Sequence, residues 1–139
     1  MLKVIVDANV WIAALLNPGK PREIQQKLKE NRYQLFFAEP LLAELKEVTA
    51  RPKFLKKIQP HKRERLIRLI KDKATAIQLP SVYSTISRDP NDDMYLICAN
   101  IAKVDFIVSG DPDLLSLGEY EGIKIITPAK FLKVLLKAQ

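Results

Sequence analysis

Apolar runs and amphipathic segments alternate along the whole chain. Short runs rich in Val, Ile, Leu and Phe predict buried strands, whereas apolar residues at helical spacing predict helices. The predicted strands are Lys3 to Val6, Gln34 to Phe37, Ala76 to Leu79, Asp105 to Ser109 and Lys124 to Ile126. The predicted helices are Ala8 to Leu16, Pro21 to Asn31, Pro40 to Ala50, a basic helix strongest from Lys62 to Ala74, Asn91 to Lys103, Asp113 to Leu117 and Pro128 to Lys137.

This order of elements predicts the architecture of the sheet. Strands that are apolar throughout and are linked by helices favour a parallel sheet covered on both faces, with right-handed crossovers. We therefore expect an α/β protein with three layers, α/β/α, and a central, mainly parallel sheet of about five strands. The Ser/Thr-rich segment Ser81 to Arg88 is predicted as a connection.

The size and the composition of the chain narrow the possible chemistry. At 139 residues and 47% hydrophobic content, residues 1–139 are expected to form a single domain with its own core. Cys98 is the only cysteine and His61 the only histidine, so neither an intrachain disulfide nor the usual zinc site can form. A Ser-His-Asp triad would need His61, which stands in a basic run and is expected at the surface.

The charge balance favours contact with polyanions. Lys and Arg number 23 against 16 acidic residues, which gives a net charge of +7 and a pI near 9.5. A soluble basic protein without a nucleic-acid role would show the same excess. Because the sequence shows no leader pattern and no apolar run of membrane-spanning length, we expect a cytoplasmic protein that does not enter a membrane.

Two aspartates follow predicted strands. In an open parallel sheet, ligands bind outside the carboxyl ends of the strands. The first apolar run leads into Asp7, and the run ending at Ser109 leads into Asp111, with Asp113 two residues later. If the two strands are neighbours, Asp7 and Asp111 meet at one edge of the sheet.

Two further acids belong beside apolar stripes of helices. On Pro40 to Ala50, Glu44 lies at the border of the apolar face, whereas Glu47 lies farther round the helix. On Asn91 to Lys103, Asp93 lies one turn before Ile97 on the buried side. Asp92 points almost oppositely, so Asp93 is expected to be the inward acid.

A group of carboxylates needs a counter-charge, because two unit charges about 4 Å apart repel by about 4 kcal/mol at an effective dielectric constant of about 20. Mg²⁺ or Mn²⁺ prefers oxygen ligands and can bridge a phosphate to a protein. Such an ion polarises a phosphodiester and activates a water molecule. Taken singly, Asp7 and Asp93 could instead be helix caps, Asp111 a turn residue, Asp113 a cap and Glu44 a solvated side chain.

Four stretches of the chain, in order and at suitable spacing, resemble motifs of the PIN domain family. They are Asp7 to Leu15 with its D-x-N opening, Leu42 to Leu45, Arg88 to Leu96, and Val108 to Leu115. The segment Ile126 to Leu132 also resembles the ending of one subfamily. Ala8 and Gly110 stand where threonine is common in the family, but neither departure removes an acidic residue.

The resemblance implies a metal-dependent endoribonuclease that cuts single-stranded RNA. It implies one or two Mg²⁺ or Mn²⁺ ions held by Asp7, Glu44, Asp93 and Asp111. It further implies supporting roles for Asn9, Asp113 and Asp92, of which Asn9 would orient a carboxylate or a water molecule. The chain is most similar to the PIN subgroup described as toxin components of toxin-antitoxin systems, which implies an antitoxin protein as a partner.

Three other readings share parts of this pattern. A haloacid-dehalogenase phosphatase needs an aspartate two residues after the first, where this chain has Asn9. A response-regulator receiver could use Lys130, but it needs a paired acidic cluster after the first strand and a phosphorylatable aspartate after the third. A non-catalytic PIN scaffold that binds RNA or a partner protein is the strongest alternative, although the intact set of acids argues against it.

Several residues outside the acidic set lead to further expectations. Trp11, Phe36, Phe37 and Cys98 stand in apolar surroundings and are expected in the core. Leucines and a phenylalanine on the last helix exceed what a small rim hides, which predicts a homodimer or a higher homo-oligomer. These residues are Phe131, Leu132, Leu135 and Leu136. On the basic helix, Lys62, Arg63, Arg65 and Lys71 are expected to lie largely outside, and Arg63, Arg65 and Lys71 are predicted to bind RNA phosphates.

Overall fold

The computed structural model of the protein describes residues 1–79 and 90–138, with the side chains of residues 90–92 left out. Its strands are β1 (Lys3–Val6), β2 (Gln34–Ala38), β3 (Thr75–Ile77), β4 (Phe106–Val108), β5 (Glu119–Tyr120) and β6 (Ile123–Ile126). Its helices are α1 (Ala8–Leu16), α2 (Lys20–Lys29), α3 (Glu39–Thr49), α4 (Pro52–Leu55), α5 (Pro60–Lys73), α6 (Pro90–Ala102), α7 (Pro112–Leu117) and α8 (Pro128–Lys137). The predicted connection Ser81 to Arg88 lies outside the described residues.

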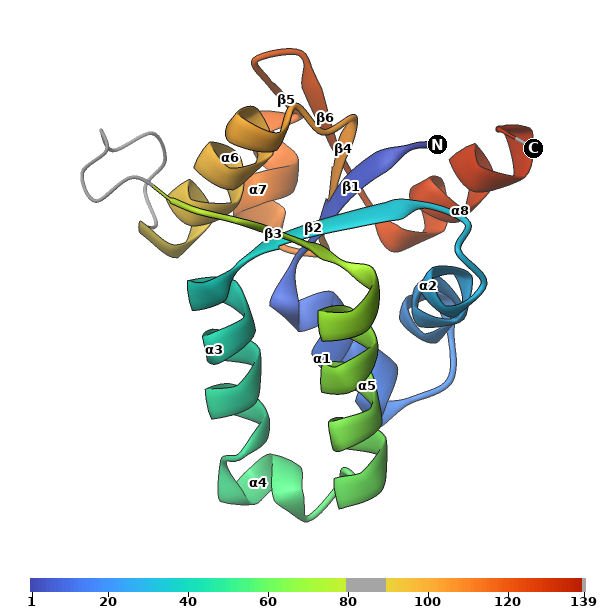
Figure 1. Ribbon diagram of the computed structural model, residues 1–139, viewed down its shortest axis with the longest axis vertical. Coiled ribbons are helices and arrows are strands. Elements are labelled where there is room, and N and C mark those ends of the chain that lie inside the picture. The colour runs from blue at the N-terminus through green and yellow to red at the C-terminus, as the bar shows by residue number, and fades with distance from the viewer. Residues whose placement is uncertain (80–89, 139) are drawn as a thin grey trace.

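The sheet confirms the predicted architecture (Figure 1). Its strand order is β3-β2-β1-β4-β6-β5. The first five strands in this order pair in parallel, whereas β5 pairs antiparallel with β6. The expectation of about five strands omitted β5, which is a two-residue strand at the edge of the sheet.

The helices begin where the sequence supplies caps and prolines. Asp7, Asp111 and Thr127 accept backbone N–H groups in the first turns of α1, α7 and α8. Proline stands in the first turn of α2, α3, α4, α5, α7 and α8, where its missing N–H costs nothing. Because α1 and α7 directly follow β1 and β4, two capped helices start at the same edge of the sheet.

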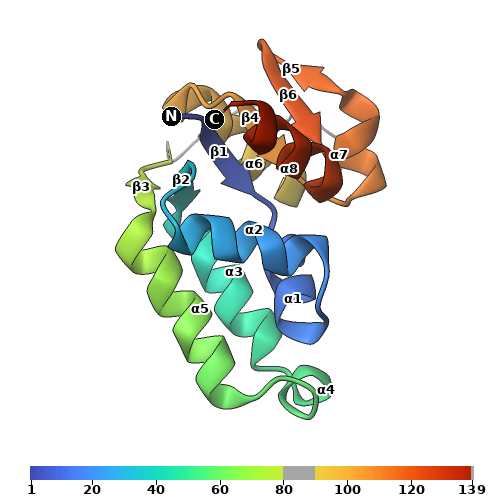
Figure 2. The ribbon, with the colours of Figure 1, turned by 90° about the vertical axis from the view of Figure 1, so that its right-hand side faces the viewer.

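Successive residues of β1 point to opposite faces of the sheet, as the period of a strand requires. Val4 and Val6 pack with residues of α1, α2, α3, α5 and α8. Ile5 packs on the other face, mainly with residues of α6 and α7. The sheet therefore lies between two helical layers (Figures 1 and 2), as expected of a three-layer α/β/α sandwich.

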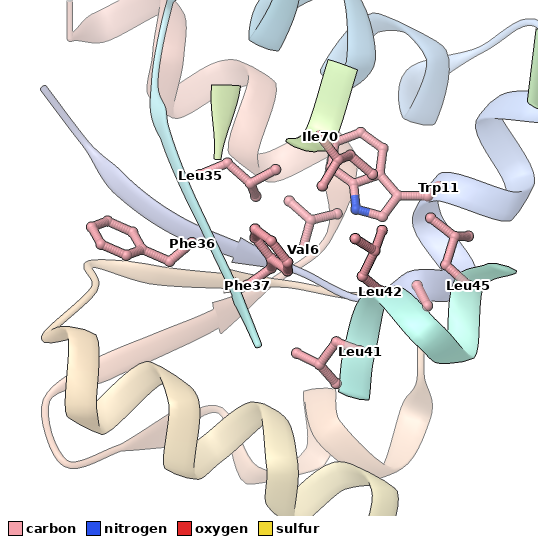
Figure 3. Close-up of a pocket in the computed structure, with 10 residues that line it drawn as sticks. Val6, Trp11, Leu35, Phe36, Phe37, Leu41, Leu42, Leu45 and Ile70 are labelled. Atoms are coloured by element: carbon pink, nitrogen blue, oxygen red, sulfur yellow. The ribbon is translucent and has the colours of Figure 1, made fainter. Parts of the chain in front are cut away.

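The core positions predicted for three aromatic residues and the cysteine are confirmed. Trp11, Phe36, Phe37 and Cys98 are all buried. Trp11 and Phe37 also line a small apolar cavity between β1, β2, α1 and α3 (Figure 3). Since only apolar residues form its walls, this cavity is a gap in the core packing rather than a ligand site.

The premise for self-association through the last helix is wrong. Phe131 and Leu135 are buried within their own chain, and the ring of Phe131 meets that of Tyr33 edge-on at 5.2 Å between centroids. Leu132 is partly covered, so Leu136, 68% exposed, is the one residue of the four that faces solvent. The apolar face of α8 is therefore covered by α2 and the sheet.

Membrane insertion through a helix finds no support in the described part of the chain. None of the helices there combines the length and the apolar character that a membrane span requires.

Candidate active site

Asp7 is a buried carboxylate at the carboxyl end of β1. It is 3% exposed, and its backbone N–H continues the ladder by donating to the Val108 carbonyl at 2.9 Å. Its Oδ1 accepts the Asn9 N–H at 3.0 Å, and so caps α1. The cap that was considered as an alternative role for Asp7 is thus present, and it leaves Oδ2 directed away from the helix ladder.

Ser109 connects Asp7 with the turn that carries Asp111. Its hydroxyl donates to Asp7 Oδ2 at 2.8 Å and accepts the Asp111 N–H at 2.9 Å. Ser109 is completely buried, because β4 continues past Val108 beside β6. Asp7 and Asp111 therefore lie at the same edge of the sheet, although Asp111 is only half-buried and its Oδ1 caps α7 by accepting the Asp113 N–H.

Tyr95 on α6 contacts the start of α1. Its hydroxyl accepts the Ala8 N–H at 3.0 Å. Burial, followed by the negative charge of Asp7, raises the pKa of Tyr95 above its ordinary value, and the charge of Glu44 adds to the rise. Asp7 and Glu44 thus both act on one phenol. Glu44 is half-buried on α3, and its Oε2 is shielded from solvent.

Asp93 lies two residues before Tyr95 on α6 and is 2% exposed. The pattern of apolar residues had assigned it to the inward side of the helix, and its burial confirms that placement. The side chain of Asp92 lies outside the described residues, so the comparison between the two acids rests on Asp93 alone.

The four acids do not form a finished metal cage. Among the described residues, no group of three or more His, Cys, Asp or Glu side chains is arranged so that it could hold a metal ion. The site is therefore a partly buried acidic edge rather than a preformed four-carboxylate cluster.

Comparison of the sequence with known proteins assigns the chain to a family. The family model described as "PIN domain" matches residues 3–113, which include all four acids. The chain belongs to the PIN domain family. It is also 28% identical, over 141 residues, to an uncharacterized protein of Methanocaldococcus jannaschii, in a match that covers 95% of this chain and 90% of the relative.

The family gives the acidic edge a chemical context. PIN domains are generally nucleases and usually use divalent metal ions. Tyr95, which accepts the Ala8 N–H, and Ser109, which donates to Asp7, were not expected from the sequence. The signals that could have found them are the position of Ser109 at the end of a buried strand and that of Tyr95 two residues after Asp93.

An open groove adjoins the acidic edge of this PIN domain. It is lined by Asn9 and Ala13 of α1, by Asp111 and Pro112 at the start of α7, and by residues 21, 110 and 128 nearby. Asn9 is exposed there, while Asp113 is exposed on the first turn of α7. Solvent therefore reaches the site from the side of α1 and α7.

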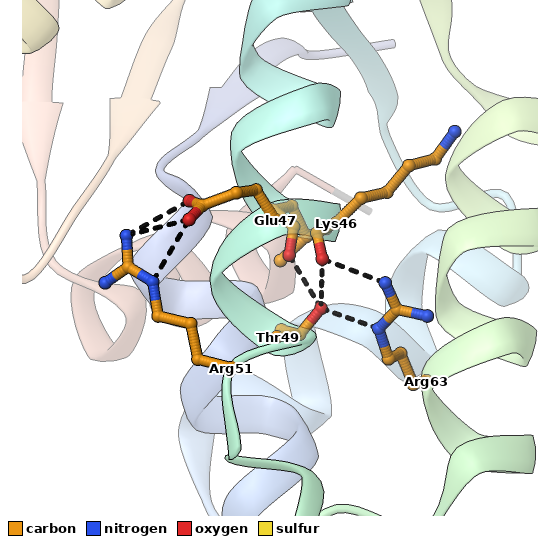
Figure 4. A network of polar contacts seen from close by, with 6 residues as sticks. Lys46, Glu47, Thr49, Arg51 and Arg63 are labelled. Carbon is orange, nitrogen blue, oxygen red and sulfur yellow. Dashed lines mark hydrogen bonds and ion pairs between the residues drawn. The ribbon is translucent and has the colours of Figure 1, made fainter. Parts of the chain in front are cut away.

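Arg63 differs from the expectation that it lies largely outside. It is half-buried, and its guanidinium donates to Thr49 Oγ1 and to the Lys46 carbonyl, both at 2.8 Å (Figure 4). These bonds tie α5 to the last turn of α3, where the Lys46 carbonyl also accepts the Ala50 N–H. The prediction failed because a helical pattern does not show which charges meet the end of another helix.

The other cations of α5 are exposed, as expected. Lys71 lies close to Lys46 of α3, and hydrogen bonding to Lys71 is the main cause that lowers the pKa of Lys46. Lys62 and Arg65 lie on the edge of α5 that faces α2. The basic helix of this PIN domain therefore has two cationic edges.

Proposed function

We propose that this PIN domain is a metal-dependent endoribonuclease that hydrolyses phosphodiester bonds of single-stranded RNA, with Asp7, Glu44, Asp93 and Asp111 as its active-site acids. The observation that carries the proposal is the position of the buried Asp7 carboxylate at the carboxyl end of β1, beside the turn that carries Asp111. Tyr95 lies within the influence of both Asp7 and Glu44, and Ser109 links Asp7 to the Asp111 turn. Asn9, Asp92 and Asp113 are assigned supporting roles.

The residues fit Mg²⁺ or Mn²⁺ by their chemistry. All four acids offer hard oxygen ligands, and a carboxylate has about four acceptor positions, so a cap does not exhaust Asp7. Mg²⁺ is usually bound through one or two carboxylates together with substrate phosphates rather than by a cage of protein ligands.

In this proposal the protein's own groups hold and orient the acidic edge. Ser109 and the Asn9 N–H fix the two oxygens of Asp7. Tyr95 fixes the start of α1 through Ala8. One or two bound divalent cations would supply charge neutralisation at the phosphate and an activated water.

The biological setting is proposed from the sequence motifs. Similarity to the toxin-like PIN subgroup supports a toxin that acts in the cytoplasm and is held inactive by an antitoxin protein. The last helix does not carry a proposal of self-association, because its apolar residues Phe131 and Leu135 are buried within the chain.

The decisive test pairs metal binding with cleavage. Mn²⁺ at about one hundred times its Kd should raise the free energy of unfolding by about 2.7 kcal/mol. Asp7→Asn and Asp93→Asn should each reduce that rise and abolish Mn²⁺-dependent cleavage of a single-stranded RNA. Asp72→Asn is the matched control, because Asp72 is exposed on α5. Cleavage that survives both site variants would refute the proposed site.

A non-catalytic scaffold that binds RNA or a partner protein is the second candidate. The observation that favours it is the lack of a finished carboxylate trio among the described residues. The same experiment separates the two, because a scaffold would bind RNA without cleaving it and would show no unfolding shift with Mn²⁺.

A further inference from the structure

A second surface, away from the acidic edge, lies in the groove between α2 and α5. Its floor is aliphatic and includes Leu15 of α1 and Leu69 of α5. Its charged lining residues are all cations: Arg22, Lys29, Lys62 and Arg65. A concave surface whose charges all have one sign concentrates counter-ions, and here it attracts anions.

Among the described residues, the four groove cations are not held in ion pairs. In the described part of the chain, the cations that pair with a carboxylate are others. They are Lys20, Lys27, Arg32 and Arg51, whose partners are Glu23, Glu30 and Glu47. None of the four groove cations forms an ion pair with a carboxylate there. Their charge is therefore available to a ligand.

The cations form two rows that face each other. Arg22 and Lys29 are seven residues apart on α2, which places them on one face and about 10 Å apart along the axis. Lys62 and Arg65 are one turn apart on α5. Arg22 is fixed, because its Nε donates to the Ala14 carbonyl at 2.9 Å, so its terminal amino groups can meet a ligand without reorganising the side chain.

We propose that this groove grips the backbone of single-stranded RNA beyond the segment that reaches the acidic edge. Two cations on each of the two helices offer several contacts for phosphates, and the lining contains no aromatic ring on which bases could stack. Such a groove holds phosphates without reading the sequence. The inference rests on the proposed function only in naming RNA as the ligand.

The two sites are connected by α1. Asp7 precedes the first residue of this helix, and Leu15 lies near its end. Leu15 lies seven positions after Ala8 in this helix, which corresponds to a rise of about 10 Å. A strand a few nucleotides longer than the part held at the acidic edge therefore reaches the groove, whereas a very short RNA does not.

The two edges of α5 have different roles in this proposal. The edge with Arg63 and Lys71 faces α3, where Arg63 serves the packing of the helices. The edge with Lys62 and Arg65 faces the groove. RNA binding is thus expected to depend on Lys62 and Arg65 more than on Arg63 and Lys71.

The test compares two triple variants of equal charge. The groove variant carries Lys29→Gln, Lys62→Gln and Arg65→Gln, and it keeps Arg22 because of its bond to Ala14. The control variant carries Lys124→Gln, Lys133→Gln and Lys137→Gln, which are exposed on β6 and α8. Binding of a fluorescent uridine 20-mer is followed by anisotropy against salt without divalent cations, so that cleavage does not interfere.

For single strands, each phosphate contact contributes about 0.7 to the slope of log affinity against log salt. The groove variant should lower that slope by about 2 and weaken binding at low salt by at least tenfold, while the control should change the slope by less than about 0.7. Lys62→Gln alone should give about a third of the change in slope. This single variant keeps the test decisive if the triple variant does not fold.

The outcomes separate this inference from the proposed nuclease activity. Equal slopes for the groove and control variants overturn the groove, even if the wild type cleaves RNA. A groove-dependent slope in a wild type that never cleaves supports the groove and rejects the nuclease. If poly-L-glutamate of similar length competes as well as the RNA does, the groove is a surface for an acidic protein segment, and the RNA assignment is overturned.

Discussion

Removing the Ser109 hydroxyl tests the architecture of the acidic edge directly. In Ser109→Ala, Asp7 Oδ2 loses a donor and the Asp111 N–H loses its acceptor. A hydrogen bond to a charged group contributes about 1.5 to 3 kcal/mol to stability. Since Ser109 is fully buried, no water replaces the hydroxyl without rearrangement, and we expect a loss of about 2 to 3 kcal/mol in the free energy of unfolding.

That loss is large enough to measure. At about 2.1 cal/mol/K per residue, the 139 residues unfold with an entropy near 0.3 kcal/mol/K, so Tm should fall by about 7 to 10 °C. Ser116→Ala is the matched control, because the exposed Ser116 hydroxyl donates only to the Asp113 carbonyl. Its effect should stay within about 0.5 kcal/mol.

Thermal and urea unfolding of both variants supply the measurement. In the proposed nuclease, Ser109 is a positioning residue, so Ser109→Ala should also lower kcat for RNA cleavage by about tenfold or more, with KM little changed. Equal stability of Ser109→Ala and Ser116→Ala would refute the bridge between Asp7 and the Asp111 turn. Lost stability with unchanged kcat would keep the bridge but remove its role in positioning Asp7.

Three further outcomes are expected. Tyr95→Phe leaves the Ala8 N–H without its acceptor and should cost about 1 to 2 kcal/mol by urea unfolding. Arg63→Gln breaks the bonds to Thr49 and the Lys46 carbonyl and should cost about 2 kcal/mol, more than Arg65→Gln costs. Burial raises the pKa of Tyr33 and is the main cause of the raised pKa of Tyr95. The contribution of these two phenols to the free energy of unfolding is therefore fully present below their unfolded pKa of about 10 and is lost as the pH rises above it. An absorbance titration should show that both tyrosines ionise only as the protein unfolds.

The order and type of the main elements could be predicted from the sequence because their signals are local. Apolar runs bounded by turns gave five strands, and helical periodicity gave the long helices within a few residues. The strand β5 was not predicted, since Glu119 and Tyr120 carry no apolar pattern and pair only because the turn at Gly122 brings them beside β6. The short helix α4 (Pro52–Leu55) was likewise not assigned as an element of its own.

The acids of the site could be predicted from their place in the pattern, whereas the groups that hold them could not. Asp7 and Asp111 follow apolar runs, and parallel strands bring such positions to one edge. Ser109 and Tyr95 belong to buried stretches and resemble core residues in sequence. Their function appears only when β1, β4 and α6 are placed together.

The last helix, α8, shows that a sequence reveals an apolar helix face more easily than it reveals which element covers that face. Its apolar residues were counted correctly, but the sequence does not show what covers them. In the structure, Tyr33 and Phe106 provide that cover for Phe131. An apolar face that the sequence leaves without a partner is therefore weak support for an oligomer in a three-layer fold, where a terminal helix has a sheet to cover.

The double use of Asp7 determines how its substitution should be interpreted. Asparagine is as good an N-cap as aspartate, so Asp7→Asn keeps an acceptor for the Asn9 N–H. The new amide group then faces the Ser109 hydroxyl, which can rotate and accept from it, because an oxygen that already accepts the Asp111 N–H has a second lone pair. The geometry at the end of β1 is thus retained, while the negative charge beside Tyr95 is removed. For this reason Asp7→Asn separates the charge of the acidic edge from its architecture, whereas Ser109→Ala perturbs the architecture and keeps the charge.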